Sequence, residues 1–206
     1  MTDDSTEPWR GRDGEFSPTY YAHKGPDATS EALADLLAAR LGRDASVLEV
    51  GCNVGRHLAH LHDEGFADLT GLDINAEAIA ELRETYPDLA AAGEFLVADL
   101  VATFADLGAG AFDVVYSVET LQHVAPADAS VFDDVARVAG SLLVTVENET
   151  PMDGSGDDVT RVNDTIPLYH RDWREVFAGR GLEQVAVGDM GRDTLRAFRV
   201  PRLDEE

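Results

Sequence analysis

An apolar strand that runs into a glycine-bracketed turn constrains this chain more than any other feature. Residues 47–50 read Val-Leu-Glu-Val and are followed by a turn with Gly51 and Gly55 at its ends and Asn53 between them. Glycine, and less readily asparagine, tolerates the left-handed backbone region, so the chain can turn sharply and let a ligand lie against its main chain. A helix should begin near Arg56, with its free N–H groups beside whatever the turn holds.

Strands and helices alternate along the rest of the chain. Apolar runs predict strands at 47–50, 69–72, 95–98, 112–117 and 142–146, and two more at 182–187 and 194–200. Uninterrupted apolar strands that alternate with amphipathic helices are typical of a parallel sheet covered on both faces. The last two runs are joined so closely that they must pair antiparallel. The predicted fold is α/β and doubly wound.

Five helices and two loops complete this prediction. Ser30 is expected to cap a helix that Gly42 ends, a second helix should stop at Gly65, and a third should start near Ala76. A fourth helix should carry Val131, Phe132, Val135 and Val138 on one face, and a short fifth helix is expected around 171–177. The segments from strand 95–98 to Gly110 and from 147 to 166 are expected to be loops.

The chain length limits how many domains the protein can form. With 206 residues and 44% hydrophobic residues, the chain can form one domain with a sizeable core. We expect a flexible acidic segment at 1–16 and a single domain at 17–206. No apolar run approaches the ~18 residues of a membrane span, and the N-terminus does not resemble a signal peptide, so a soluble, cytoplasmic protein is expected. Cys52 is the single cysteine, which excludes an internal disulfide.

The charge is extreme. The chain has 40 acidic and 16 basic residues, a formal net charge of −24, and Lys24 is its single lysine. The acids are spread along the chain, which indicates a solvating surface. Such a composition is typical of proteins from extreme halophiles, because salt screens the self-repulsion. In molar salt the Debye length falls to ~3 Å, so the charge indicates habitat more than partner.

Two acids at strand ends complete a family pattern. Glu49 and the turn 51–55 follow the first strand, Asp73 ends the second and Asp99 ends the third. With the closing hairpin, this set resembles class I S-adenosyl-L-methionine-dependent methyltransferases over about residues 30–200. The resemblance implies a mostly parallel seven-stranded sheet with a C-terminal antiparallel hairpin. One departure is Asn53, where the family often has glycine.

The resemblance implies a cofactor site for S-adenosyl-L-methionine. Asp73 would accept from the ribose hydroxyls, as in dinucleotide folds, and Asp99 from the adenine amino group. The other implied cofactor residues are Glu49, Gly51, Cys52, Asn53, Gly55, Ile74, Leu100 and Ser117. Two alternatives stay open: Asp73 and Asp99 could cap the following segments, and Glu49 could be a structural anchor.

Candidates for the chemistry follow the fourth and fifth strands, where ligands bind in open α/β sheets. His123 is the first candidate for a general base and Glu119 the second, with a packing histidine and a loop acid as the alternatives. Candidate substrate contacts are Glu147, Asn148, Tyr169 and His170, for which a solvated loop is the alternative, and Tyr21, which could instead anchor its segment to the core. His57, His60 and His62 are interpreted as a polar helix face, and no metal is expected.

The substrate is predicted only by class. The segment 117–120 reads Ser-Val-Glu-Thr, which differs from the Asn/Asp-Pro-Pro-Tyr/Phe of amine and adenine N-methyltransferases. No basic, aromatic platform for nucleic acid is evident, so a small-molecule acceptor is favoured, with a monomer or a homodimer equally open. Two other functions remain. They are a non-catalytic cofactor-binding sensor or partner subunit, and a nicotinamide-dependent oxidoreductase, whose usual Gly-x-Gly-x-x-Gly is missing here.

Overall fold

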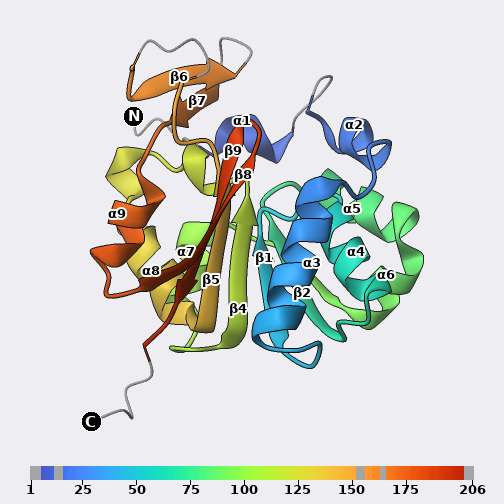
Figure 1. Ribbon diagram of the computed structural model, residues 1–206. Helices are drawn as coiled ribbons and strands as arrows, with labels where there is room; N and C mark the ends of the chain where they lie inside the picture. Colours follow the sequence, from blue (N-terminus) through green and yellow to red (C-terminus); the bar gives the residue numbers. More distant parts are fainter. Residues whose placement is uncertain (1–5, 12–15, 152–155, 163–165, 202–206) are drawn as a thin grey trace. The chain divides into compact units, whose positions relative to one another are not determined.

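The strands form a mostly parallel α/β sheet that ends in an antiparallel hairpin, and this confirms the fold predicted from the sequence (Figure 1). The computed structural model describes residues 6–11, 16–151, 156–162 and 166–201. Within them, seven strands belong to the main sheet. The chain divides into two compact units, Met1–Thr103 and Phe104–Glu206.

Three parallel strands form the sheet of the first unit, in the order β3-β2-β1. Leu72 of the central strand pairs with Val50 on one side and with Leu96 on the other, so the three strands end close together. Helices α3, α4 and α5 pack beside these strands (Figure 1). The elements of this unit are α1 (Glu7–Arg10), α2 (Pro18–Ala22), α3 (Ala28–Arg40), β1 (Ser46–Val50), α4 (Arg56–Asp63), β2 (Asp68–Asp73), α5 (Ala76–Thr85), α6 (Pro87–Ala92) and β3 (Glu94–Val97).

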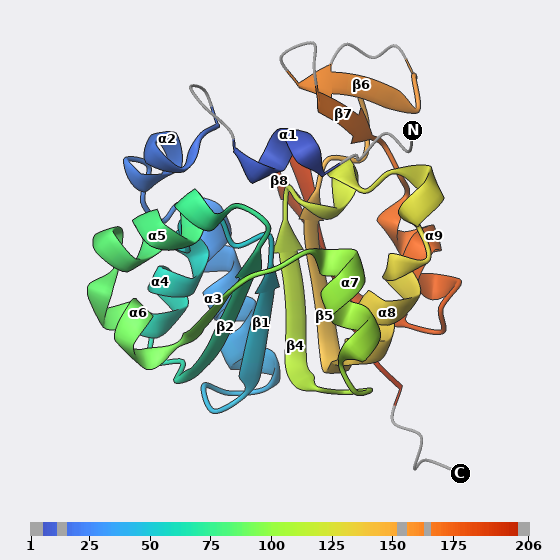
Figure 2. The same ribbon diagram turned by 180° about the vertical axis from the view of Figure 1, so that it is seen from behind.

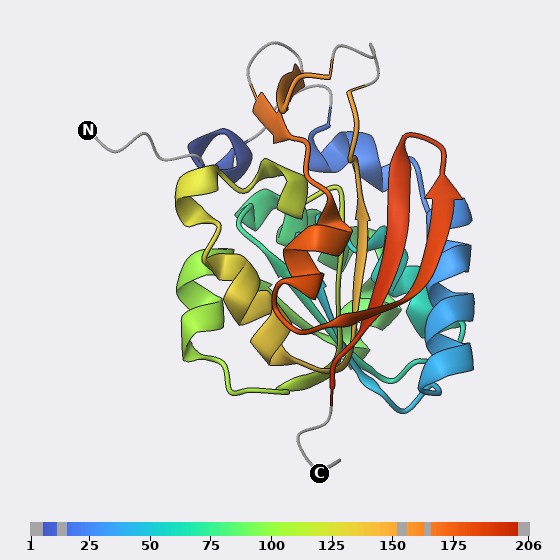
Figure 3. The same ribbon diagram turned by 60° about the vertical axis from the view of Figure 1, so that its left-hand side comes forward.

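The second unit carries the remaining strands in the order β4-β5-β9-β8. β4 and β5 are parallel, whereas β9 runs antiparallel to both β5 and β8. Helix α8 packs against β4 and β5 and stands to the right of β5 in Figure 2, and Figure 3 shows the β8–β9 hairpin in red at the front. The elements are β4 (Phe112–Val118), the 3-10 turns η1 (Leu121–His123) and η2 (Pro126–Asp128), α8 (Val131–Val138), β5 (Ala139–Glu147), β6 (Val159–Val162), β7 (Ile166–Tyr169), α9 (Trp173–Ala178), β8 (Glu183–Met190) and β9 (Asp193–Arg199).

Aromatic side chains hold the helices of the second unit to its sheet. The ring of Trp173 on α9 lies 5.3 Å from Phe132 on α8 in a T-shaped arrangement, and Phe177 lies 5.4 Å from Phe198 on β9. All four side chains are buried. Such pairs contribute about 0.5–1.5 kcal/mol beyond their area burial. They therefore stabilise the packing of α8 against α9 and of α9 against the sheet.

Helix caps differ from the sequence prediction in one place. The N-cap of α3 is Asp27 and not Ser30, because the Asp27 carboxylate accepts N–H bonds from Thr29 and Ser30 while the Ser30 hydroxyl accepts from the Asp27 N–H. The prediction found one half of this capping box and missed the residue that starts it.

Several elements were missed. The segment after β3, predicted as a loop, contains α7 (Leu100–Asp106), and the predicted loop 147–166 contains β6, which pairs antiparallel with β7. Part of the segment predicted to be flexible, 1–16, forms α1, while residues 1–5 and 12–15 lie outside the described residues. In the described ranges, none of the helices is both long enough and apolar enough to cross a bilayer.

Candidate functional site

Left-handed backbone shapes the turn after β1. Gly51, Asn53 and Gly55 have φ angles of 70°, 49° and 74°. The backbone N–H groups of Gly51 and Cys52 both donate to the carbonyl oxygen of Leu72, at 2.7 and 3.0 Å. The turn is therefore closed onto the end of the neighbouring strand β2, and the helix α4 starts directly after it.

Asp73 fastens the middle of this turn. Its Oδ2 accepts the backbone N–H of Asn53 at 2.8 Å, and its Oδ1 accepts that of Asn75 at 2.8 Å. Burial raises the pKa of Asp73 above its ordinary value, while the N–H donors of Asn75, Asn53 and Ile74 oppose the shift. Each oxygen keeps a second lone pair. Asp73 thus caps the loop, which is one of the two alternatives of the sequence prediction, and its oxygens keep lone pairs that a ligand could use.

The turn also contains a buried acceptor to which none of the described residues donates. The side-chain Oδ1 of Asn53 is buried and has no hydrogen-bond partner in the described part of the chain. A buried carbonyl oxygen without a donor is costly, by about 1–3 kcal/mol. A ligand with an N–H donor at this turn would relieve that cost.

Two further predicted cofactor residues lie inside the unit. Glu49 on β1 and Cys52 are buried. Burial raises the pKa of the Cys52 thiol well above its ordinary value, and the charges of Asp73 and Glu49 add to this. The thiol therefore stays protonated and is a packing group, whereas Ile74 beside it is only half-buried.

Asp99 lies beyond the end of β3, where it caps α7. Its Oδ1 accepts the Ala102 N–H at 3.2 Å, and its backbone carbonyl accepts from Thr103 at 2.9 Å. The guanidinium of Arg10 in α1 lies 3.6 Å from Oδ2. Asp99 and the adjoining Leu100, the first residue of α7, thus form a helix start that α1 approaches.

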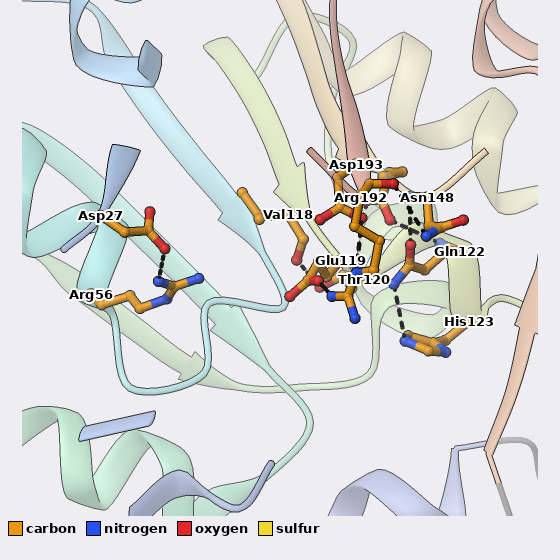
Figure 4. A network of polar contacts seen from close by, with 11 residues as sticks. Asp27, Arg56, Val118, Glu119, Thr120, Gln122, His123, Asn148, Arg192 and Asp193 are labelled. Carbon is orange, nitrogen blue, oxygen red and sulfur yellow. Dashed lines mark hydrogen bonds and ion pairs between the residues drawn. The ribbon is translucent and has the colours of Figure 1, made fainter. Parts of the chain in front are cut away.

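Tyr21 is placed at the exit of the glycine turn. The Arg56 guanidinium carbon lies 5.9 Å from the centre of its ring, and Arg56 is the first residue of α4. Arg56 also forms an ion pair with Asp27 (Figure 4). Tyr21, one of the predicted substrate contacts, thus stands beside the candidate cofactor loop.

The interpretation of His57 as part of a polar helix face is wrong. His57 is buried, and its Nδ1 lies 2.8 Å from the Ser30 hydroxyl on α3. Burial, helped by the charge of Arg56, lowers the pKa of His57 to about 3. His60 and His62, on the same helix, are half-buried. Among the described residues, no group of three His, Cys, Asp or Glu side chains could hold a metal.

In the second unit, Glu147 is buried and holds the segment that follows β4. Its Oε1 accepts the Ser117 hydroxyl at 2.5 Å and the N–H groups of Thr120 and Leu121, and its Oε2 accepts the Gln122 N–H at 3.1 Å. Burial raises the pKa of Glu147 to about 7, although these donors oppose the shift. Glu147, predicted as a substrate contact, and Ser117, predicted as a cofactor contact, therefore hold each other inside the unit.

His123 ends the segment that Glu147 holds. Its Nδ1 lies 2.9 Å from the Pro167 carbonyl oxygen on β7, and its Nε2 lies 3.4 Å from the Gln122 side-chain nitrogen. The ring is only half-buried. This combination of a fixed ring and partial exposure suits a general base.

Glu119 and Asn148 meet the tip of the β8–β9 hairpin (Figure 4). Glu119 forms an ion pair with Arg192, and the Asn148 side chain donates to the Arg192 carbonyl oxygen at 3.2 Å. The Glu119 backbone is left-handed, with φ 49°. Asn148 is 2% exposed, and its Oδ1 has no partner in the described part of the chain.

The other two predicted contacts lie on and after β7. The Tyr169 ring centre is 5.0 Å from the Arg171 guanidinium carbon, and the His170 Nε2 is 2.9 Å from the Thr160 hydroxyl on β6. Both side chains are half-buried. They belong to the base of the β6–β7 hairpin.

Sequence reasoning missed three residues that hold these groups in place. Gln122 bridges Asn148 and His123, Arg192 pairs with Glu119, and Arg56 links Asp27 to Tyr21. Arg56 directly follows the glycine turn in the sequence, and this position could have marked it as a site residue. Gln122 and Arg192 gave no such signal, because Asn148 and Glu119, the partners that fix them, lie far away in the sequence.

Residues 47–140 match the family model described as "Methyltransferase domain". A dTDP-3-amino-3,4,6-trideoxy-alpha-D-glucopyranose N,N-dimethyltransferase of Streptomyces venezuelae is 35% identical over 71 residues, which are 34% of this chain and 30% of that protein. Phosphoethanolamine N-methyltransferase 3 of Arabidopsis thaliana is 29% identical over 144 residues, or 69% of this chain and 28% of that protein. The matches thus span about a third of these relatives' length.

Solved structures resemble the chain over most of its length. The magnesium protoporphyrin IX methyltransferase of Synechocystis PCC 6803, with bound SAH, has a TM-score of 0.67 at 18% identity, and the likeness covers 96% of this chain and 94% of that one. The fold is that of class I methyltransferases, and the domain match lies on the part that carries the glycine turn and both strand-end acids.

Proposed function

We propose that this chain, whose residues 47–140 match the methyltransferase-domain family, transfers a methyl group from S-adenosyl-L-methionine to a small molecule. The observation that carries the proposal is the bond from the Asn53 N–H to Asp73 Oδ2 at 2.8 Å. It fixes a left-handed turn in which the buried Asn53 Oδ1, to which no described residue donates, lies beside a carboxylate with spare lone pairs.

The residues present fit this cofactor. Asn53 Oδ1 would accept from the amino group of its methionine part, and the two Asp73 oxygens would accept from the ribose hydroxyls. Asp99 and Ile74 would lie toward the adenine. The other residues proposed to shape the site are Glu49, Gly51, Cys52, Gly55, Leu100 and Ser117.

The bound cofactor would supply a methyl group that its sulfonium already activates. The chain then has to align the acceptor and take its proton. We assign the proton to His123 Nε2. The electron pair of the broken N–H or O–H bond stays on the acceptor atom, which forms the new bond to carbon.

The acceptor proposed is a small molecule. Two relatives are named for a sugar amine and for phosphoethanolamine, and a structural neighbour for a porphyrin. The side chains proposed to meet it are those of Asn148, Glu119, Tyr169, His170 and Tyr21. Nucleic acid is not an expected partner, and a monomer or a homodimer is equally compatible with the proposal.

The proposal extends to organisation and habitat. Residues 17–206 would work as a single domain, in the cytoplasm of a halophile, since the net charge of −24 and the single lysine favour a salt-rich medium. The two alternatives, a non-catalytic sensor or partner subunit and a nicotinamide-dependent oxidoreductase, make different predictions for turnover and for cofactor choice.

A transfer assay tests the proposal. Purified protein in molar KCl would be incubated with methyl-labelled S-adenosyl-L-methionine and a panel of small amines and hydroxyl compounds. Label in one product, lost in His123→Ala and kept in His62→Ala, supports the enzyme. Cofactor binding without transfer to any acceptor would favour the sensor, and binding of NADH alone the oxidoreductase.

A further inference from the structure

Strand β3 is an edge strand, because among the described strands it pairs with β2 alone. The N–H of Ala98, directly after β3, donates to the Asp73 carbonyl oxygen of β2 at 2.9 Å. The backbone groups of successive residues in a strand point to opposite sides, so those of Leu96 also face β2. The N–H and C=O groups of Phe95 and Val97 therefore face the open edge.

The same edge exposes apolar side chains. Leu96 and Val97 are 44% and 52% exposed, and Val101 in the first turn of α7 is 40% exposed. Three of the five large hydrophobic side chains that are exposed among the described residues thus lie within six positions of the chain. The chain has 40 acidic residues, yet residues 95–97 of its edge strand carry no charge.

The edge strand of the second unit, β8, has the protection that β3 lacks. Its register with β9 is irregular between Gln184 and Ala186, and it carries the acids Glu183 and Asp189. Bulges and charged side chains are the usual means by which edge strands avoid pairing with another chain. The register of β3 with β2 is continuous. β3 is therefore the edge that can accept a further strand.

The β3 edge is complementary to itself. When two copies align antiparallel with Leu96 opposite Leu96, the outward groups of Phe95 meet those of Val97 in the second copy. Glu94 then lies opposite Ala98, so the acid of the strand meets an uncharged residue. A parallel alignment in register would place Glu94 against Glu94, and like charges directly opposite destabilise a strand pair.

We propose that the edge of β3 is the interface for a second copy of this chain, and that two copies join by antiparallel β3–β3 pairing about a two-fold axis at Leu96. The two Leu96 side chains meet on one face of the joined sheet. On the other face, Val97 packs against the half-buried Phe95 of the second copy. The exposed Arg83 side chain, whose Nη2 lies 3.5 Å from the Phe95 carbonyl oxygen, moves aside.

The charge and the size of the edge determine how firmly the copies associate. Each copy has a formal net charge of −24, and molar KCl shortens the Debye length to ~3 Å, which screens this repulsion but keeps the apolar contacts. A strand of four residues buries little area, so the dimer should be in equilibrium with the monomer. This dimer does not depend on methyl transfer.

Disulfide trapping tests the register of the pairing. Cα atoms directly opposite in a non-hydrogen-bonded antiparallel pair are ~4.5 Å apart, which is within disulfide range. Oxidation of Leu96→Cys in molar KCl should therefore give a covalent dimer on a non-reducing gel. Glu94→Cys is the matched control, because its two Cα atoms would lie ~13 Å apart along the strands. Val187→Cys, on β8, is the second control, and the native Cys52 is buried.

Sedimentation in molar KCl tests the association without a cross-link. The wild type should pass from monomer to dimer as its concentration rises. Leu96→Asp should weaken the dimer by at least about tenfold, because two like charges then meet at the axis. Val187→Asp makes the same change at a side chain 60% exposed on β8 and should leave the dimer unchanged.

Three results would overturn the proposal. They are a wild type that stays monomeric at every concentration, an equal effect of Leu96→Asp and Val187→Asp, and trapping at position 96 that is no faster than at 94 or 187. A monomeric wild type would leave the edge to a different protein chain. If Leu96→Asp does not fold, the trapping of Leu96→Cys against its two controls decides the question.

Discussion

The carboxylate of Asp73 holds the backbone of Asn53, with Oδ2 2.8 Å from the Asn53 nitrogen. The second oxygen accepts the N–H of Asn75, so one side chain fixes both the glycine turn and the start of α5. The loop is therefore ordered by the same acid that is proposed to meet the ribose.

Asp73→Asn is expected to destabilise the protein even without ligand. The carboxamide has one oxygen for two N–H donors, so one of them faces an NH2 group. An unsatisfied buried donor costs about 1–3 kcal/mol. Urea unfolding in molar KCl measures the loss. Asp68→Asn, at the exposed start of β2, removes the same charge and should cost much less; equal losses in both variants would contradict the role of the two bonds.

Glu147 should make stability depend on pH. Its pKa is about 7 in the folded protein and 4.5 is its ordinary value, so the folded state binds more protons than the unfolded state between these values. Stability is then fully present below about pH 4.5 and falls as the pH rises toward 7. The free energy of unfolding of the wild type relative to Glu147→Gln should therefore decrease across this window. A difference that stays constant with pH would show that the carboxyl does not titrate there.

His57 gives the opposite pH dependence. Its pKa is lowered from 6.5 to about 3, so the unfolded state binds more protons between these values. Stability is present above about pH 6.5 and is lost as the pH falls toward 3. Each protein is compared with its own stability at neutral pH. On that scale, His57→Gln should lose stability at a lower pH than the wild type does. The account fails here if the wild-type ring titrates by NMR near its ordinary value.

Salt should stabilise the fold. At a net charge of −24, self-repulsion acts on both units, and raising KCl from about 0.1 M to about 1 M shortens the Debye length from ~10 Å to ~3 Å. Each kcal/mol gained raises Tm by about 2–4 °C in a chain of this size. Thermal unfolding at several KCl concentrations measures this rise in Tm, and choline chloride serves as a second screening salt. A Tm that does not rise with salt would remove the argument for a halophile.

The strands could be predicted because their signal is local. Val47, Leu48 and Val50, or Leu142, Leu143 and Val144, are consecutive apolar residues that the sheet buries. The helix α7 was missed although Asp99 preceded it as a cap and Leu100 and Phe104 were at helical spacing. β6 could not be found in the same way, because its alternation spans only the four residues Val159–Val162.

The candidate site could be predicted only where its residues directly follow a strand. The glycine turn, Asp73 and His123 stand at strand ends that the sequence marks. The burial of His57 depends on the Ser30 hydroxyl, 27 positions away, and that of Glu147 on a segment about 25 positions earlier in the chain. Contacts at such separation follow from how elements pack, and no single-sequence pattern encodes them.

Cofactor binding is best tested by calorimetric titration of S-adenosyl-L-methionine and S-adenosylhomocysteine into the protein in molar KCl, with NADH as control. We expect micromolar binding of the first two, lost in Asp73→Ala and kept in Asp68→Ala, and no binding of NADH. Folded protein that binds neither sulfur compound, or that binds NADH instead, would contradict this expectation.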